Sequence, residues 1–156
     1  MENLQFFYDF EISKQGLLDC LNTISADKQA NKTTYGDATC YYVQMGLASI
    51  TLLENAFKGV IFNFQESSLE FVNSLNAEIF NRYSEKLISE KDYLTYLQML
   101  GAYFGWCAVK KYKAYFATFE NQKVLVLNNK AFNPALILKL CSEENKNVSL
   151  FFQNLC

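Results

Sequence analysis

The sequence predicts a predominantly helical α+β fold, with an N-terminal strand, about six helices and one antiparallel β-hairpin around a single core. Apolar residues recur at intervals of three and four over most of the chain, which is the spacing of one helix face. They alternate near the N-terminus, and they flank a polar reversal at residues 120–122. A chain of 156 residues with 51% hydrophobic and 19% charged residues is suited to one core. We therefore expect residues 1–156 to form a single domain.

Residues 4–12 predict a strand with one solvated face. Apolar side chains alternate there with Gln5, Phe7, Asp9 and Glu11, so a period of two places these four on the same face. Phe7, Asp9 and Glu11 form a candidate partner-binding surface whose two carboxylates would face a basic protein. The same acids would suit glycosidic chemistry if they lined a cleft. A solvated strand face is the commoner explanation for such a pair.

Three amphipathic helices are expected in the first half of the chain. Ser13 is placed to cap the first, Gly59 follows the second where a left-handed residue is common, and Ser67 or Ser68 caps the third. A polar segment without apolar periodicity separates the first two helices, and a short β-prone run precedes the third. The expected ranges are helices at 14–25, 39–58 and 69–83, a loop at 26–37 and the β-prone run at 60–64.

The helix expected over Glu90–Lys111 is the candidate central element. Ser89 and Asp92 occupy the two ends of a capping-box pattern before it. Apolar and aromatic residues cover all its faces, so we expect burial nearly all round. Gly101 and Gly105 lie one turn apart on one face, an arrangement that lets another backbone pack closely. Such a face would also admit a flat ligand, but helix packing is the commoner reason for this spacing.

The last third predicts a β-hairpin followed by two helices. Strand-forming residues at Tyr115–Phe119 and Val124–Leu127 flank the polar reversal, so the two strands should be antiparallel. Asn133 is a good N-cap and Pro134 suits the first helical position, which predicts a helix to residue 141. A last helix is expected over Val148–Leu155.

The residues that several classes of function require are absent or rare in this chain. There is no histidine, which removes the commonest general base and imidazole metal ligand, and no metal-ligand spacing or phosphate-cradling loop occurs. We expect neither a metal nor another cofactor. Arg82 is the only arginine among 14 basic residues and the net charge is −2, so we expect no nucleic-acid partner.

The cysteines bear on the compartment. Cys20, Cys40, Cys107, Cys141 and Cys156 are an odd number without any C-x-x-C spacing, so we expect reduced, structural thiols. The N-terminus lacks a basic segment followed by an apolar one, and the longest uncharged stretches fall short of the roughly 20 apolar residues that span a bilayer. These features predict a cytoplasmic protein without a membrane partner.

Four short elements follow one another in residues 90–155: Gly101-Ala-Tyr-Phe-Gly105 in a helix, the hairpin, Asn133-Pro134 opening a helix, and Phe151-Phe152 in the last helix. In this order they resemble a small uncharacterised bacterial domain family. The chain departs from that family at Trp106, where an acidic residue is usual, and no Trp leads the hairpin. Similar domains occur among accessory and toxin-immunity proteins, so the resemblance implies a binding role.

Two function classes follow from these features. The first is a cytoplasmic protein-binding module, most concretely an immunity protein that neutralises a cognate toxin. An aromatic content of 16%, much of it tyrosine, suits protein-binding surfaces. The second is a small enzyme that uses carboxylates or a thiol in a cleft. A concave pocket with converging titratable groups would favour the enzyme, and a flat or convex acidic face with exposed tyrosines would favour the binder.

Overall fold

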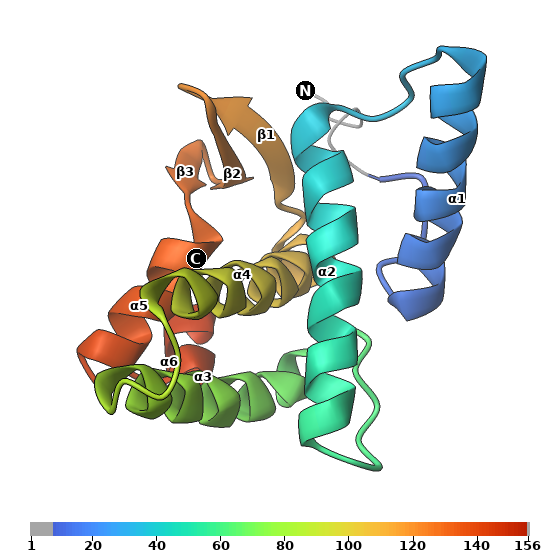
Figure 1. Cartoon of the computed structure of the whole chain (residues 1–156). Helices are drawn as coiled ribbons and strands as arrows, with labels where there is room; N and C mark the ends of the chain where they lie inside the picture. The colour runs from blue at the N-terminus through green and yellow to red at the C-terminus, as the bar shows by residue number, and fades with distance from the viewer. Residues whose placement is uncertain (1–7, 156) are drawn as a thin grey trace.

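A computed structural model describes residues 8–155 (Figure 1). Its helices are Lys14–Ala30 (α1), Asp37–Ala56 (α2), Leu69–Ser84 (α3), Glu90–Tyr112 (α4), Pro134–Glu143 (α5) and Val148–Gln153 (α6), and a short 3-10 turn, Glu66–Ser68 (η2), leads into α3. The strands Tyr115–Phe119 (β1), Gln122–Leu127 (β2) and Lys130–Phe132 (β3) form one antiparallel sheet in the order β1-β2-β3. The predicted fold class, α+β and predominantly helical, is confirmed.

Helix α4 is the central element. The Ser89 side chain accepts a hydrogen bond from the Asp92 amide at its N-terminus, as the sequence predicted, and every residue from Gly101 to Val109 is buried. α4 packs against α2, α3 and α5, which surround it in Figure 1. The second half of α4 is therefore buried on all faces because it has neighbours on all faces. The prediction of burial nearly all round is wrong for the first half, where Leu94, Thr95 and Gln98 are exposed to solvent.

Helix α1 lies on the outer side of α2, which is its main neighbour (Figure 1). Its first residue also reaches the loop after α2, where the Lys14 amide donates to Asn63 Oδ1 at 2.8 Å. Ser13 caps it through a hydrogen bond from the Gly16 amide. The prediction that it ends near Ser25 was too short, because the helix continues to Ala30 and stops at Asn31 in a left-handed conformation. Most of its last turn is solvent-exposed and therefore shows no apolar periodicity, although Lys, Gln and Ala favour a helix there.

The predicted N-terminal strand is wrong for residues 8–12, which form bends, while residues 4–7 lie outside the described part of the chain. The segment packs onto the core through its side chains and does not pair with a strand through its backbone. The Phe116 amide of β1 donates to the Tyr8 hydroxyl at 2.9 Å, and the rings of Tyr8 and Phe10 lie 5.4 and 5.9 Å from that of Trp106. The alternation of apolar and polar residues therefore predicted correctly which side chains point inward and which point outward. It did not show that the segment pairs with another strand.

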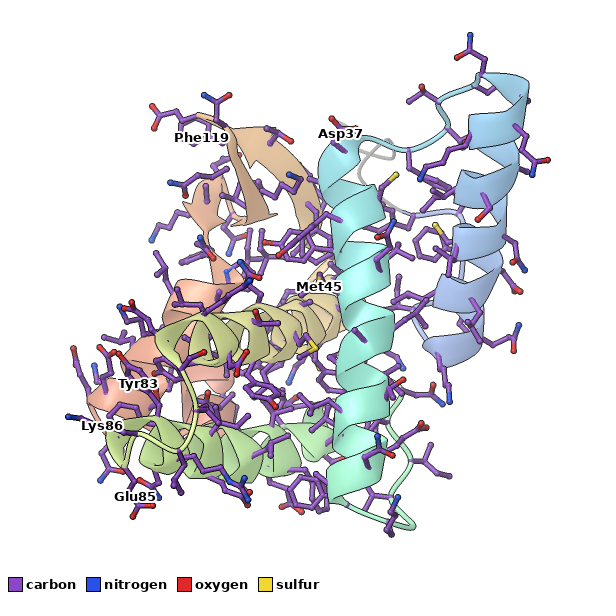
Figure 2. The ribbon with its side chains drawn as sticks, in the orientation of Figure 1. Asp37, Met45, Tyr83, Glu85, Lys86 and Phe119 are labelled. Carbon is purple, nitrogen blue, oxygen red and sulfur yellow. The ribbon has the colours of Figure 1, made fainter. Side chains whose placement is uncertain are left out.

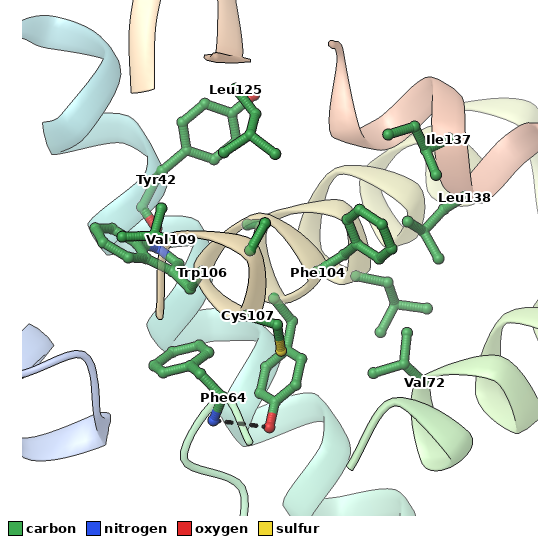
Figure 3. Close-up of a cluster of buried hydrophobic side chains, with 14 of the residues drawn as sticks. Tyr42, Phe64, Val72, Phe104, Trp106, Cys107, Val109, Leu125, Ile137 and Leu138 are labelled. Carbon is green, nitrogen blue, oxygen red and sulfur yellow. Dashed lines mark hydrogen bonds between the residues drawn. The ribbon is translucent and has the colours of Figure 1, made fainter. Parts of the chain in front are cut away.

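The β-prone run at residues 60–64 is also not a strand. Phe62 and Phe64 are buried, and Phe64 has a positive φ of 63°, which is unusual for an aromatic residue. Its amide donates to the Tyr103 hydroxyl at 3.0 Å, as the dashed line in Figure 3 shows, and that hydroxyl lies 2.6 Å from Ser68 Oγ. Contacts with α4 therefore fix the course of this loop.

The hairpin is as predicted, but the sheet has a third strand that the sequence reasoning missed. Glu120 and Asn121 both have positive φ, and so do Asn128 and Asn129, so each pair of adjacent strands is joined by a two-residue turn. An Asn-Asn pair between strand-forming residues was the available signal for β3. The chain then enters α5, where the Asn133 side chain accepts from the Ala135 amide.

Polar groups inside the core are hydrogen-bonded across elements. Trp106 Nε1 donates to the Tyr42 carbonyl at 2.7 Å, and the Tyr42 hydroxyl donates to the Lys123 carbonyl at 2.6 Å. Figure 3 shows Tyr42, Trp106 and Leu125 side by side, from α2, α4 and β2. Side chains fill the space between α4 and its neighbours in Figure 2, and Phe119 extends from the far end of the hairpin. These bonds fix the positions of the sheet and α2 relative to α4.

Candidate functional site

An apolar groove opens between β3 and α6, and we call it the C-terminal groove. Its volume is about 540 Å³. The lining residues are Lys130, Phe132, Lys146, Asn147, Leu150, Phe151, Asn154 and Leu155. The volume falls in the range of roughly 300–1,000 Å³ that is typical of concave binding sites.

Helix α6 places its apolar side chains on two faces. Val148 and Phe152 are fully buried and hold the helix on the core, whereas Leu150 is 58% exposed. Asn147 caps α6 by accepting a hydrogen bond from the Leu150 amide at 3.1 Å. Phe151 is half-buried beside Phe104. The groove therefore borders a short helix that is anchored on one side and apolar on the other.

Two asparagines of α3 hold the elements behind the groove. Asn73 Oδ1 accepts from the Val148 amide at 3.0 Å, and Asn76 Nδ2 donates to the Leu138 carbonyl at 2.9 Å. The Asn76 side chain is almost fully buried, and its Oδ1 atom has no hydrogen-bond partner in the described part of the chain. These two amides connect α3 to α5 and α6, and so position the helix that lines the groove.

The charges of the groove are of one sign. Within the described part of the chain, Lys130 and Lys146 are its charged lining residues, and no carboxylate side chain lines it. Lys146 Nζ lies 3.4 Å from Glu144 Oε1 in an ion pair whose two side chains are about half exposed. Exposed pairs of this kind contribute little to stability. The groove thus offers an apolar floor beside two cations.

The predicted partner-binding acids are exposed but do not share a strand face. The Tyr35 hydroxyl donates to Asp9 Oδ1 at 2.7 Å, and the Ser13 hydroxyl donates to Glu11 Oε1 at 2.8 Å. Phe7 lies outside the described residues. That this surface binds a partner stays a prediction.

The two acids also do not meet in a cleft. Glu11 lines a small cleft of about 230 Å³ together with Lys110 and Lys113, and Asp9 does not line it. Hydrolysis of a glycosidic bond needs two carboxylates on opposite sides of the bound sugar. The described lining of this cleft contains one carboxylate, that of Glu11.

Gly101 and Gly105 lie where other elements approach α4 most closely. A Cβ atom on Gly101 would lie 2.7 Å from the backbone nitrogen of Ala135, and one on Gly105 would lie 2.9 Å from the Phe116 ring. Both distances are shorter than ordinary van der Waals contact. The glycine face of α4 is therefore occupied by the start of α5 and by β1, which leaves no space there for a flat ligand.

The described cysteines are free thiols in poor surroundings for a nucleophile. Cys20, Cys107 and Cys141 are buried and Cys40 is half-buried. Burial raises the pKa of each thiol, that of Cys20 from 9.0 to about 11 and that of Cys107 well above its ordinary value. They are therefore protonated near neutral pH, whereas the thiolate is the nucleophilic form. Cys156 lies outside the described residues.

Within residues 8–155, no group of three or more Cys, Asp and Glu side chains is arranged to hold a metal ion. Among the helices of the same residues, none combines the length and the apolar character that a bilayer span requires.

Comparisons of the chain with known protein families, with curated proteins and with solved structures find no match. The resemblance of residues 90–155 to a bacterial domain family stays a prediction. The sequence reasoning also did not select the C-terminal groove as a site. A signal was present, because Leu150 and Phe151 make the last helix apolar beyond the stripe that Val148 and Phe152 need for burial.

Proposed function

We propose that this chain is a protein-binding module that acts through the C-terminal groove, and that its partner is a toxin, which it neutralises as an immunity protein does. The observation that carries the proposal is the concave apolar surface formed by the half-buried Phe132, Phe151 and Leu155 and the exposed Leu150. A concave, mostly apolar site with a few polar groups at its edge is the usual form of a binding pocket. Occlusion of a partner requires only such a surface.

The chemistry of the groove favours binding over the alternative of a small enzyme. Among residues 8–155, its lining contains no carboxylate side chain and no thiol. The smaller cleft at Glu11 contains one carboxylate, which accepts a hydrogen bond from Ser13. An acid–base mechanism needs a matched pair of groups or a metal, and a thiol mechanism needs a thiolate with its base. These observations support a module without turnover of its own.

The cytoplasm is the compartment in which we propose that the chain acts. Four thiols among the described residues are free, three of them buried, as is usual for proteins of a reducing compartment. The neutralising role draws further support from the resemblance of residues 90–155 to domains found among toxin-immunity proteins. A preformed groove on a well-packed scaffold also limits the entropic cost of binding.

Co-expression with the product of the neighbouring gene tests the proposal. We expect that product to arrest growth when produced alone, and this chain to relieve the arrest. The variant Leu150→Asp should lose the relief. Leu136→Asp is the matched control, because Leu136 is also 58% exposed on a helix but does not line the groove.

Three outcomes separate the possibilities. Relief by Leu150→Asp equal to that by the original chain would remove the groove from the interface. Loss of relief in the double variant Asp9→Lys/Glu11→Lys, with Leu150→Asp still active, would assign binding to the N-terminal acids instead. A neighbouring product that neither arrests growth nor forms a complex with this chain would contradict toxin neutralisation.

A further inference from the structure

We infer that the element bound in the C-terminal groove is an acidic amphipathic helix of the partner, with its apolar side chains between β3 and α6 and its carboxylates against Lys130 and Lys146. This inference rests on the proposed function, since it assumes that the groove is the interface. It adds the charge and the shape of what binds there.

The sign of the charge comes from the lining. The chain as a whole has 16 acidic and 14 basic residues, yet the charged side chains that line the groove within residues 8–155 are two lysines. Lys130 and Lys146 belong to β3 and to the turn before α6, so the two cations come from different elements. Complementary charges at the rim of an interface steer association and select the partner. A basic segment would meet two like charges.

Both lysines are available to a partner at little cost. The pair between Lys146 and Glu144 is solvent-exposed, so exchanging Glu144 for a carboxylate of the partner loses little. Lys130 has no ion pair within the described residues.

The form of the groove favours a helix over an added strand. A partner strand would need the free edge of β3, but β3 has three residues, and alternate residues of an edge strand turn their backbone groups outward. Such an edge offers too few hydrogen bonds to hold a strand. A helix instead presents a stripe of apolar side chains at positions i, i+3, i+4 and i+7, and such stripes bind in apolar grooves of proteins.

Two lysines are also too few to favour a membrane as the occupant. Lipid-binding basic clusters usually contain about four to eight cationic residues beside a membrane-embedded segment. The groove instead exposes Lys130, Lys146 and Leu150. These side chains are complementary to one helix of a partner that has a single apolar stripe and one or two acidic residues on each side of it.

Two fluorescent peptides test the inference directly. The first is a 15-residue helical peptide with leucines at i, i+3, i+4 and i+7 and glutamates along both borders of that stripe. The second is identical except that lysine replaces each glutamate. We expect the acidic peptide to bind more tightly by about tenfold or more at low salt, and the difference to shrink as salt is added.

Charge reversal of the groove should reverse this preference. The double variant Lys130→Glu/Lys146→Glu should favour the basic peptide. The control Lys32→Glu/Lys58→Glu changes the net charge equally at exposed positions outside the groove and should keep the original preference. Amide resonances of Phe132, Leu150 and Leu155 should shift when the acidic peptide is added.

The contrary results are equally specific. Equal affinity for both peptides, a preference unchanged by Lys130→Glu/Lys146→Glu, or resonance shifts away from the groove would overturn the inference. Binding of phosphatidylserine vesicles in place of the acidic peptide would overturn it in favour of a membrane. The growth test with Leu150→Asp does not involve these peptides, so a failure of the inference can be told apart from a failure of the proposed function.

Discussion

Helices α4 and α6 contain similar proportions of apolar residues but have opposite roles. Residues Gly101 to Val109 of α4 are all buried because α2, α3, α5 and β1 cover every face. Helix α6 has six residues, and only the side that bears Val148 and Phe152 is covered. The contrast shows that apolar content does not by itself distinguish core from binding surface. The number of covering elements does.

The polar groups of the two regions differ in the same way. In α4, the Tyr103 hydroxyl and Trp106 Nε1 are hydrogen-bonded to backbone or side-chain groups of other elements. At the C-terminal groove, Lys130 and Lys146 extend from the rim. The hydrogen bonds of α4 are satisfied inside the protein and favour one arrangement of the core. The charges of Lys130 and Lys146 can instead interact with another protein.

The largest expected effect is on α4. Phe104→Ala should lower the free energy of unfolding by about 3–5 kcal/mol, because it leaves a cavity at a fully buried aromatic residue. Leu97→Ala should cost about 2–5 kcal/mol for the same reason. Equilibrium unfolding in urea measures both. A loss below about 0.5 kcal/mol, the size of a surface effect, would contradict the central place of α4.

A smaller effect is expected where α5 meets α4. Gly101→Ala adds a methyl group 2.7 Å from the Ala135 nitrogen, so the helices must move apart. We expect a loss of about 1–3 kcal/mol. Gly36→Ala is the control, since nothing lies within 4 Å of the added atom, and it should change stability by less than about 1 kcal/mol.

Removal of one hydroxyl should have a similar or slightly smaller effect. Tyr103→Phe leaves the buried Phe64 amide without its acceptor, which should cost about 1–3 kcal/mol. Amide exchange should then quicken at Phe64 more than at Leu97 in α4. Equal protection of Phe64 in the two proteins would show that the hydroxyl does not hold the loop.

Alkaline pH should weaken the core. Burial raises the pKa of Cys20 from 9.0 to about 11, and it also raises the pKa of Tyr42 and Tyr103 above 10.0. These groups lose their protons more readily in the unfolded chain, so their contribution is complete below pH 9 and is lost as pH rises through the folded pKa values. Melting temperatures should therefore fall above about pH 9. Cys20→Ala should make the first part of this decline shallower.

The smallest effect on stability is expected in the groove. Leu150→Asp should change the free energy of unfolding by no more than about 0.5 kcal/mol, because the side chain is 58% exposed. The same variant should abolish binding of the acidic peptide. A loss of several kcal/mol would mean that Leu150 belongs to the core, and the contrast between α4 and α6 would fail.

Local signals made much of the fold predictable. The capping side chains Ser13, Ser89 and Asn133 act where the sequence indicated, because a cap depends on residues within a few positions of each other. The failed strand at residues 8–12 depended on a distant partner. At the edge of β1, Phe116 bonds to the Tyr8 side chain and not to a backbone group of this segment.

The groove as a whole could not be predicted for the same reason, although the extra apolar residues of the last helix were a local signal for one of its walls. Lys130 and Phe132 of β3 meet Leu150 and Leu155 near the end of the chain only because the chain passes through α5 between them. No spacing within one helix or strand encodes that meeting. The glycines of α4 were different, since Gly101 and Gly105 lie one turn apart within a single helix and their face could be recognised locally.

Trp106 gives the protein a built-in optical reporter. It is the only tryptophan of the chain, it is fully buried, and its ring lies within 6 Å of Tyr8, Phe10 and Phe116. Its fluorescence emission should therefore lie at short wavelength in the native state and shift to the red when α2, α4 and β1 separate. Trp106 does not line the C-terminal groove, so a filled groove should leave its spectrum unchanged. Emission at one wavelength thus follows folding, and a dye on the peptide follows occupancy, in the same cuvette.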